Sequence, residues 1–477
     1  MSARRVSGAS QIVLGGREPT SVRKIRRFAA IWVAKLLIAG LRLLKRRGSH
    51  LPGLVATKIC PTIIADIAKP ARVVAVTGTN GKTTTSNLLA DALAGEGHKV
   101  LNNSFGSNTP GGVATALIDG VTWRGRSTCE MGVFEIDERS AYRTVPGLKP
   151  HLMVCTNLTR DSMARNAHPE YIAWMLSLII PKETTLVLNA DDLICATLGK
   201  ASTPRVLFGI GPLPTDGTTP HGAEVDLSAC PQCGVTLTWD YWRYNHCGHA
   251  RCPACGLESP YPRYAVTAID TEAGQVTVDA AGHVFTCRLI DDNIVNVYNQ
   301  AVVVAVLDQL GVPIDRIAAA FDHLAPPASR VTISHVGNLT IVRHLVKGAV
   351  PVACSRTFQY LMSFPGAKAV AMDIDDAHYV KHDCQNNCWL YETDYEHFVN
   401  ADLKQIVVGG VRRYDQALRL MIAGVDPAII VTNPDESRSG ELVDLDGIDT
   451  VINLHSFFNA PTTGEAVQAQ LMERVRA

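Results

Sequence analysis

The sequence lacks an excess charge of either sign, a long uncharged apolar run, an internal repeat and a low-complexity tract. Its 477 residues contain 45 Lys and Arg against 45 Asp and Glu, so no overall field attracts nucleic acid or another polyanion. No uncharged apolar stretch reaches the roughly 18 residues of a membrane-spanning helix, which excludes a polytopic membrane protein. At this length we expect about three domains, and any recognition of phosphate has to be local.

Cysteine is present in an odd number, and no export signal is recognisable. With 13 cysteines and no small-residue cleavage site after the apolar segment near the N-terminus, neither a disulfide framework nor a secretory signal peptide is expected. The predicted location is therefore the cytoplasm, where clustered cysteines are interpreted first as metal ligands.

Residues 28–44 form an apolar segment that is interrupted by Lys35 and Arg42 and flanked by basic clusters at 23–27 and 45–47. The segment is marginal in length for a membrane span. Its basic flanks suit a helix that lies at an anionic surface, which would place the protein peripherally at the inner face of the plasma membrane. The alternative is a helix packed on the next domain.

Strand-like and helical patterns alternate along much of the chain. Residues 72–76 indicate a buried strand that leads through a Gly-rich turn into a helical pattern at 86–94, and two more strands, at 152–155 and 185–188, flank a helical pattern at 171–180. This alternation predicts an α/β fold with a parallel sheet. A second α/β region is expected beyond residue 326, with a helix at 414–423 and strands at 339–342, 369–372, 405–408 and 428–431.

The turn after the first strand, TGTNGKT at residues 77–83, is the strongest indication of phosphate binding. It departs from the GxxxxGK[ST] pattern, because Val76 stands six residues before Lys82, but it keeps the functional end. Glycines let backbone N–H groups close around phosphate oxygens at the positive end of the following helix. Lys82 is expected on the β- and γ-phosphates and Thr83 on Mg²⁺, the alternative being a Gly-rich turn without a ligand.

Two CPxCG sequences predict a metal site in an inserted module at residues 228–260. The ligands would be Cys230, Cys233, Cys252 and Cys255. Four thiolates with this spacing can surround one Zn²⁺ and leave no open position, so the zinc is expected to be structural. The neighbouring His246, Cys247 and His249 are competing ligands that break the symmetry of the two pairs.

Acidic and amide side chains follow several predicted strands, at the carboxyl edge where open α/β sheets bind ligands. Glu135 could hold Mg²⁺ directly or through water, or could be a solvated surface acid. The others share this position and are Asn157, Asp161, Asn189, Asp191 and Asp192.

Taken in order, these motifs resemble the Mur ligase superfamily. The resemblance rests on TGTNGKTT, the acid of FEIDE, TNL with a following Asp, LNADD, and NVYNQA at residues 296–301. The cysteine ribbon, the apolar-basic N-terminal segment that leads into LPG at 51–53, and GVRRYDQALRL at 410–420 are similar to the MurT-type group. The match extends over about residues 35–425.

The resemblance implies an α/β architecture and a reaction. The fold would be a parallel-sheet, P-loop-type central domain at 70–325 with an inserted four-cysteine zinc ribbon, after a lead-in at 1–69 and before a smaller α/β C-terminal domain at 326–477. ATP would phosphorylate the α-carboxylate of D-glutamate in the lipid II stem peptide. Ammonia from a GatD-type glutaminase partner would then give D-isoglutamine, and no nucleic acid is involved.

Site residues carried over from the family are implied in the same way. The phosphate loop would comprise Thr79, Asn80, Gly81, Lys82, Thr83 and Thr84. Glu135 matches the Mg²⁺-binding acid, Asn296 and Asn299 match a pair near adenine, and Arg330 matches an Arg that reaches the γ-phosphate. Lys82, Glu135 and Asp383 are the predicted catalytic residues.

Three departures keep other functions open. Residues 348–357 read GAVPVACSRT where the group shows NPAGxNQ, Asp383 lies six residues before Trp389 whereas the expected acid position is nearer Asn386, and His168 is two residues late for a Mg²⁺-linked His. One alternative is a Mur-like ligase that adds an amino acid to another carboxylate, against which the ribbon argues. The other is a nucleotide-binding scaffold without catalysis.

Overall fold

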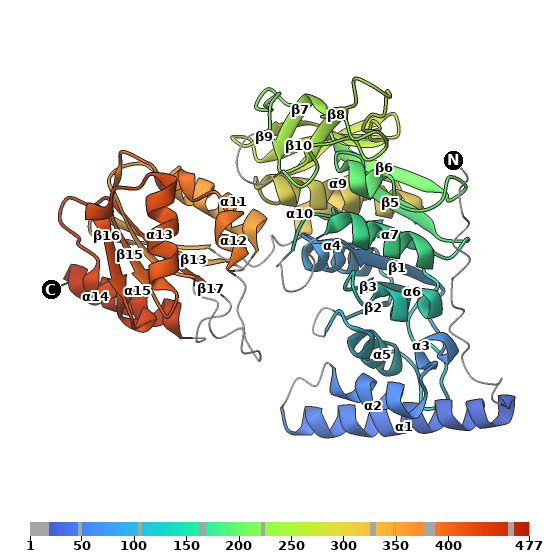
Figure 1. Cartoon of the computed structure of the whole chain (residues 1–477). Helices are drawn as coiled ribbons and strands as arrows, with labels where there is room; N and C mark the ends of the chain where they lie inside the picture. Colours follow the sequence, from blue (N-terminus) through green and yellow to red (C-terminus); the bar gives the residue numbers. More distant parts are fainter. Residues whose placement is uncertain are drawn as a thin grey trace, which may run out of the picture.

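The computed structural model describes residues 19–45, 50–103, 107–161, 168–220, 225–324, 331–346, 348, 350–374, 387–456 and 462–476. Within these ranges, every helix is too short or too polar to cross a membrane. Figure 1 shows two α/β units and a long N-terminal helix that runs along one end of the molecule.

The larger unit is built on a nine-stranded sheet in the order β11-β10-β9-β6-β5-β4-β1-β3-β2. Seven neighbouring strands of this sheet pair in parallel, namely β2, β3, β1, β4, β5, β6 and β9. Strands β10 and β11 extend the sheet beyond β9 as antiparallel strands. Their bounds are β1 Arg72–Thr77, β2 Val100–Asn102, β3 Met131–Glu135, β4 Leu152–Cys155, β5 Thr185–Asn189, β6 Arg205–Ile210, β9 Tyr264–Asp270, β10 Gln275–Ala280 and β11 His283–Arg288. The predicted parallel α/β sheet is thereby confirmed.

Helices cover both faces of this sheet, which is why its central strands are continuous apolar runs. Along β1, Val73 and Ala75 belong to the core on one face and Val74 and Val76 to the core on the other. The first core includes α5 (Pro110–Asp119), α6 (Ala141–Leu148), α7 (Pro169–Ile179) and α8 (Leu193–Ala196). The second includes α4 (Lys82–Gly95), α9 (Ile294–Gln309) and α10 (Ile314–His323).

The N-terminal segment forms α1 (Thr20–Leu43), α2 (Leu51–Ile59) and α3 (Ile63–Asp66). Ala30, Ile31, Ala34 and Ile38 of α1 are buried in the first core, so one face of this helix packs on the domain. Helix α2 approaches α5 very closely, because a Cβ atom at Gly53 would lie 1.9 Å from the carbonyl oxygen of Gly111.

The cysteine-rich insert leaves the sheet after β6 and returns at β9. Its antiparallel strands β7 (Thr238–Tyr244) and β8 (Cys247–Arg251) form a separate two-stranded sheet. The predicted inserted module is therefore present in the fold.

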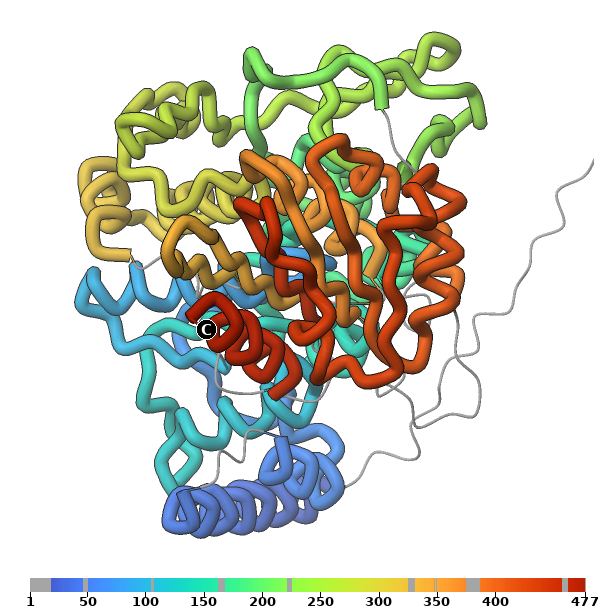
Figure 2. The backbone as a smooth tube through the Cα atoms, turned by 90° about the vertical axis from the view of Figure 1, so that its left-hand side faces the viewer, coloured from blue at the N-terminus to red at the C-terminus, as the bar shows by residue number. Residues whose placement is uncertain are grey.

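The smaller unit is a six-stranded sheet in the order β12-β13-β17-β14-β15-β16. The strands are β12 Val331–Val336, β13 Leu339–Val346, β14 Lys368–Asp373, β15 Leu403–Gly409, β16 Ile430–Asn433 and β17 Thr450–Ser456. The main helices are α11 Pro351–Met362, α12 Cys388–Tyr391, α13 Arg413–Ala423, α14 Ser439–Leu442 and α15 Thr463–Arg476. Seen from the side in Figure 2, this unit lies in front of the larger sheet.

The strand predicted at 428–431 begins two residues late in this sheet. The side chain of Asp426 accepts a hydrogen bond from the backbone N–H of Ala428 and caps a 3₁₀ turn, Pro427–Ile429, so the strand begins only at Ile430. The other three strands and the helix predicted in this region are confirmed.

Candidate nucleotide site and cysteine cluster

The phosphate loop joins the end of β1 to the start of α4, as the sequence predicts. Gly78 and Gly81 have φ values of 127° and 82°, a region that side-chain-bearing residues rarely adopt. Gly81 is the N-cap residue of α4, which begins at Lys82. The loop is thus strand, tight turn and helix N-terminus, the arrangement that presents backbone N–H groups to an anion.

Asn157, which follows β4, holds the loop from the side. Its Oδ1 accepts a hydrogen bond from the backbone N–H of Asn80 at 3.0 Å, and its Nδ2 donates to the carbonyl oxygen of Asn80 at 3.1 Å. The backbone N–H of Thr79 donates to the carbonyl of Asn157 at 2.8 Å. Asn157 therefore lies at the carboxyl edge, as expected, and shapes the loop.

The side chain of Lys82 contacts the loop and also pairs with Glu138, an acid that the sequence analysis did not predict for this site. Its Nζ donates to the carbonyl oxygens of Gly78 and Thr79 and forms an ion pair of 3.1 Å with Oε2 of Glu138. Burial alone would lower the pKa of Lys82, but the carboxylate of Glu138 outweighs it and the pKa is raised. Lys82 is therefore charged at neutral pH. The last acid of FEIDE was the available signal for Glu138.

Thr83 and Glu135 meet beside the loop. The hydroxyl of Thr83 donates to Oε2 of Glu135 at 2.8 Å, and Nδ2 of Asn108 donates to Oε1 at 3.0 Å. Asn103 fixes the backbone of Glu135 by bonding both its N–H and its carbonyl. A hydroxyl and a carboxylate oxygen at this separation are hard oxygen donors, so the pair fits a Mg²⁺ ion.

The two asparagines at the start of α9 also border the loop. Asn299 accepts a hydrogen bond from the hydroxyl of Thr85 at 3.1 Å and donates to Oδ1 of Asn296 at 3.0 Å. A Cβ atom at Gly81 would lie only 2.2 Å from Oδ1 of Asn299. Residues far apart in sequence are thus assembled into one site, while the predicted role of the asparagines toward adenine stays a prediction.

Gly81→Ala is expected to abolish nucleotide binding. The added methyl would collide with Asn299, and the left-handed backbone would cost about 1 kcal/mol as well. Gly97→Ala is the matched control, because Gly97 follows the other end of α4 with a φ of 88° and open space around its Cβ position. Calorimetric titration with ATP should show binding lost in the first variant and kept in the second; equal affinities would contradict the role of the contact.

The two acids that follow β5 both bind other groups of the protein. Asp191 accepts hydrogen bonds from Arg243 at 2.8 Å and from the hydroxyl of Tyr298 at 2.6 Å. Asp192 binds the backbone N–H of Leu158 at 2.6 Å and His246 at 3.0 Å. Both acids lie near the predicted edge, where they fasten the β7–β8 hairpin to the core.

Burial and the contacts of these acids shift the pKa values of Asp191 and His246. Burial raises the pKa of Asp191 in spite of the nearby Arg243. For His246, burial lowers the pKa, but the carboxylate of Asp192 outweighs this and raises it. Both ring nitrogens of His246 have protein partners, Asn245 and Asp192, and His246 lies outside the four-cysteine cluster.

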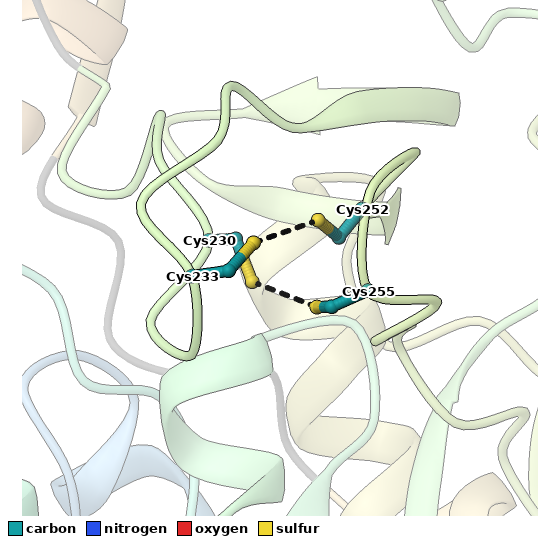
Figure 3. A group of neighbouring side chains, drawn as sticks. All are labelled: Cys230, Cys233, Cys252 and Cys255. Atoms are coloured by element: carbon teal, nitrogen blue, oxygen red, sulfur yellow. Dashed lines mark hydrogen bonds between the residues drawn. The ribbon is translucent and has the colours of Figure 1, made fainter.

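The thiols of the two CPxCG sequences converge on one point (Figure 3). The Sγ atoms of Cys230 and Cys255 are 3.5 Å apart, those of Cys233 and Cys252 are 3.4 Å apart, and all four lie within 4.8 Å of one another. A tetrahedron with Zn–S bonds of about 2.3 Å has edges of about 3.8 Å, so the cluster fits a zinc ion. The predicted four-cysteine group is confirmed.

Arg330 and Asp383 lie outside the described residues. The same holds for Asn386 and for residue 349 of the altered segment that begins at residue 348. Their predicted roles stay predictions. Thr84 lies in the first turn of α4, beside Thr83.

Two family models match the chain. The Mur ligase middle domain matches residues 76–212, which hold the phosphate loop and Glu135, and the MurT ligase C-terminal domain matches residues 345–450. The chain belongs to the MurT-type Mur ligases.

Curated relatives agree with this membership of the MurT-type group. The chain is 28% identical to the lipid II isoglutaminyl synthase (glutamine-hydrolyzing) subunit MurT of Staphylococcus aureus strain COL, over 90% of its own length and 95% of the relative's. It is also 28% identical to the subunit of the same name from Streptococcus pneumoniae, over 79% of its own length and 83% of the relative's.

Solved structures share the fold of this MurT-type chain at low sequence identity. A pseudomurein peptide ligase type C from Methanothermus fervidus superposes with a TM-score of 0.65 at 18% identity, covering 86% of this chain and 81% of that one. MurF from Acinetobacter baumannii gives a TM-score of 0.56 at 14% identity, with 88% and 80% covered.

Proposed function

We propose that this chain is the ATP-using subunit of a lipid II isoglutaminyl synthase. It would amidate the α-carboxylate of D-glutamate in the stem peptide of lipid II to D-isoglutamine. The observation that carries the proposal is the similarity to two subunits of that name over most of both chains. In the same chain, the side chains of Lys82, Thr83, Glu135 and Asn299 lie together at one phosphate loop.

The reaction needs activation because the carboxylate would have to expel oxide. Transfer of the γ-phosphoryl group of ATP to a carboxylate oxygen gives an acyl phosphate and ADP. The lone pair of ammonia then attacks the carbonyl carbon, the C–O bond to phosphate breaks, and the nitrogen loses a proton. Catalysis of this kind rests on positioning and on neutralising the charge of the moving phosphoryl group.

The roles of the loop residues follow from their contacts. The ammonium of Lys82 now binds carbonyl oxygens of the loop, and phosphate oxygens would replace these as its partners. Thr83 and Glu135 would hold Mg²⁺, which supplies charge neutralisation between the phosphates when bound. We assign Arg330 to the γ-phosphate, Asn296 and Asn299 to the adenine side, and Asp383 to the chemistry at the acceptor.

The domain plan and the partner belong to the same proposal. Residues 1–69 would be the lead-in, 70–325 the ATP-binding domain with a structural zinc in its ribbon, and 326–477 the C-terminal domain. The relatives are named as subunits of a glutamine-hydrolyzing enzyme. We therefore infer a glutaminase partner of the GatD type that delivers ammonia.

Mass analysis of lipid II tests the proposal. The purified chain is incubated with ATP, lipid II in detergent and unlabelled ammonium, and the Lys82→Ala variant serves as the inactive control. We expect an amino group to replace one hydroxyl at the α-carboxyl of D-glutamate, which makes the product slightly lighter than lipid II, with release of ADP. Glutamine should replace ammonium only when the glutaminase partner is added.

Other outcomes would overturn it. A gain in mass that matches an added amino acid would indicate a peptide-forming ligase. ATP binding without lipid II-dependent ADP release would indicate a non-catalytic scaffold.

A further inference from the structure

Helix α1 has a second apolar stripe on the side that does not pack on the domain. Its members are Val22, Ile25, Trp32, Val33, Leu36 and Leu43, whose side chains are between 38% and 86% exposed. Apart from the adjacent Trp32 and Val33, they follow one another at intervals of one or two helical turns, so they lie along one side of the helix. From Ile25 to Leu43 the stripe is about 27 Å long.

The place of α1 in the molecule leaves this stripe accessible. In both Figure 1 and Figure 2 the helix runs along one end of the molecule, with α2 and α5 on its inner side. The buried residues Ala30, Ile31 and Ala34 face that inner side. The exposed stripe therefore forms an outer edge of the protein.

Positive charge is concentrated around the stripe. The described residues 19–45, which include α1, contain seven Lys and Arg and no acid, although the whole chain has no net charge. Arg23 and Arg42 pair with Asp66 and Asp119 of the domain, and Lys24 and Arg26 are exposed beside Ile25. An apolar stripe bordered by cations complements a surface that is apolar inside and anionic at its rim.

Two tryptophans add the side chains that favour a boundary between water and lipid. The indole N–H of Trp32 donates to the carbonyl oxygen of Trp123 at 2.9 Å, and both rings are more than half exposed. Lys35 lies 5.8 Å from the centre of the Trp123 ring. Amphipathic rings of this kind gather at headgroup level, with long cationic side chains that reach the phosphates.

We propose that the outer stripe of α1 docks on the surface of an anionic lipid bilayer, with the helix lying in the plane of the interface. The lipid contact is carried by α1 itself. The docking would bring the phosphate loop to a lipid-linked substrate, and this role rests on the proposed function.

Vesicle co-sedimentation of the full chain tests the docking. The Ile25→Glu/Leu36→Glu variant removes the apolar contact, and Lys24→Glu/Arg26→Glu reverses the charge beside it. Matched controls carry the same changes elsewhere: Leu418→Glu/Ile422→Glu on exposed positions of α13, and Arg263→Glu/Lys404→Glu. Vesicles of phosphatidylcholine alone are compared with vesicles that also contain phosphatidylglycerol.

The unchanged chain and both controls should bind the anionic vesicles, and each α1 variant should bind them more than about tenfold more weakly. Binding to phosphatidylcholine alone should be weak. Equal binding by the α1 variants and their controls would overturn the proposal. So would a concentration-dependent dimer in light scattering that Ile25→Glu/Leu36→Glu abolishes, because the stripe would then bind a second copy.

Amidation assays separate this inference from the proposed function. The Ile25→Glu/Leu36→Glu variant should amidate lipid II in detergent as the unchanged chain does, and should lose activity on lipid II embedded in vesicles. Activity absent from both chains in detergent would refute the proposed function and leave the vesicle binding as measured.

Discussion

Lys82→Ala is expected to reduce lipid II-dependent ADP release by at least about a thousandfold. The ammonium of Lys82 is the cation at the start of α4, where it contacts the loop carbonyls that surround the site. In the proposed reaction, the charge that develops on the moving phosphoryl group would not be neutralised without this cation. Initial rates of ADP release with saturating ATP and lipid II measure the loss, and Lys99→Ala, at an exposed position before β2, is the control.

The same substitution removes the cation that pairs with the buried Glu138. Breaking such a pair from one side costs on the order of 3 kcal/mol of folding free energy. Lys82→Ala/Glu138→Gln should therefore regain much of the stability of the parent chain in thermal unfolding while it stays inactive. If Lys82→Ala keeps full turnover, the assignment of the loop is wrong; if the double variant is the less stable one, the two side chains do not stabilise each other.

Cys233→Ser is expected to release the metal from the ribbon. Three thiolates hold zinc much more weakly than four, because the fourth position then falls to a neutral hydroxyl or to water. Metal content per chain, measured by atomic emission, should fall from about one to near zero, and the unfolding midpoint should drop by several degrees, on the order of 5 °C. The fraction of the variant that stays folded should keep the same rate of lipid II-dependent ADP release as the parent chain.

Cys129→Ser is the matched control for this change. Cys129 is a half-buried thiol before β3 and lies outside the cysteine cluster. This variant should keep its zinc and unfold at the same midpoint temperature as the parent chain. A full complement of zinc in Cys233→Ser would mean that the cluster is not the site that binds it.

The parts of the molecule that the sequence predicts well are those that local chemistry determines. The TGTNGKT turn needs glycine at the positive φ values found at Gly78 and Gly81, and the CPxCG pairs need it at Gly234 and Gly256. Such signals are contained in a few consecutive residues. The two motifs therefore predict the positions of the strand, turn, helix and thiols without any information on tertiary contacts.

The parts that the sequence did not predict depend on distant partners. Strand β17 is the last in the chain, yet it pairs between β13 and β14 in the middle of its sheet. Glu138 follows β3 in a loop, and only the fold brings it to Lys82. The acids of LNADD look like ligand-binding groups in the sequence, but Arg243 and His246 reach them from the inserted hairpin, about 50 residues later.

The close approach of Gly53 to Gly111 bears on the geometry of the proposed docking of α1 on a lipid surface. Since even a methyl group at Gly53 would collide with the backbone of α5, α2 cannot move closer to α5 or shift along it without disrupting this packing. Residues Ser107–Thr109, which lead into α5, include the Asn108 that bonds Glu135. In the proposed docking, the residues around Glu135 would therefore stay at a fixed distance from the lipid surface, and a lipid-linked substrate would have to reach them from there.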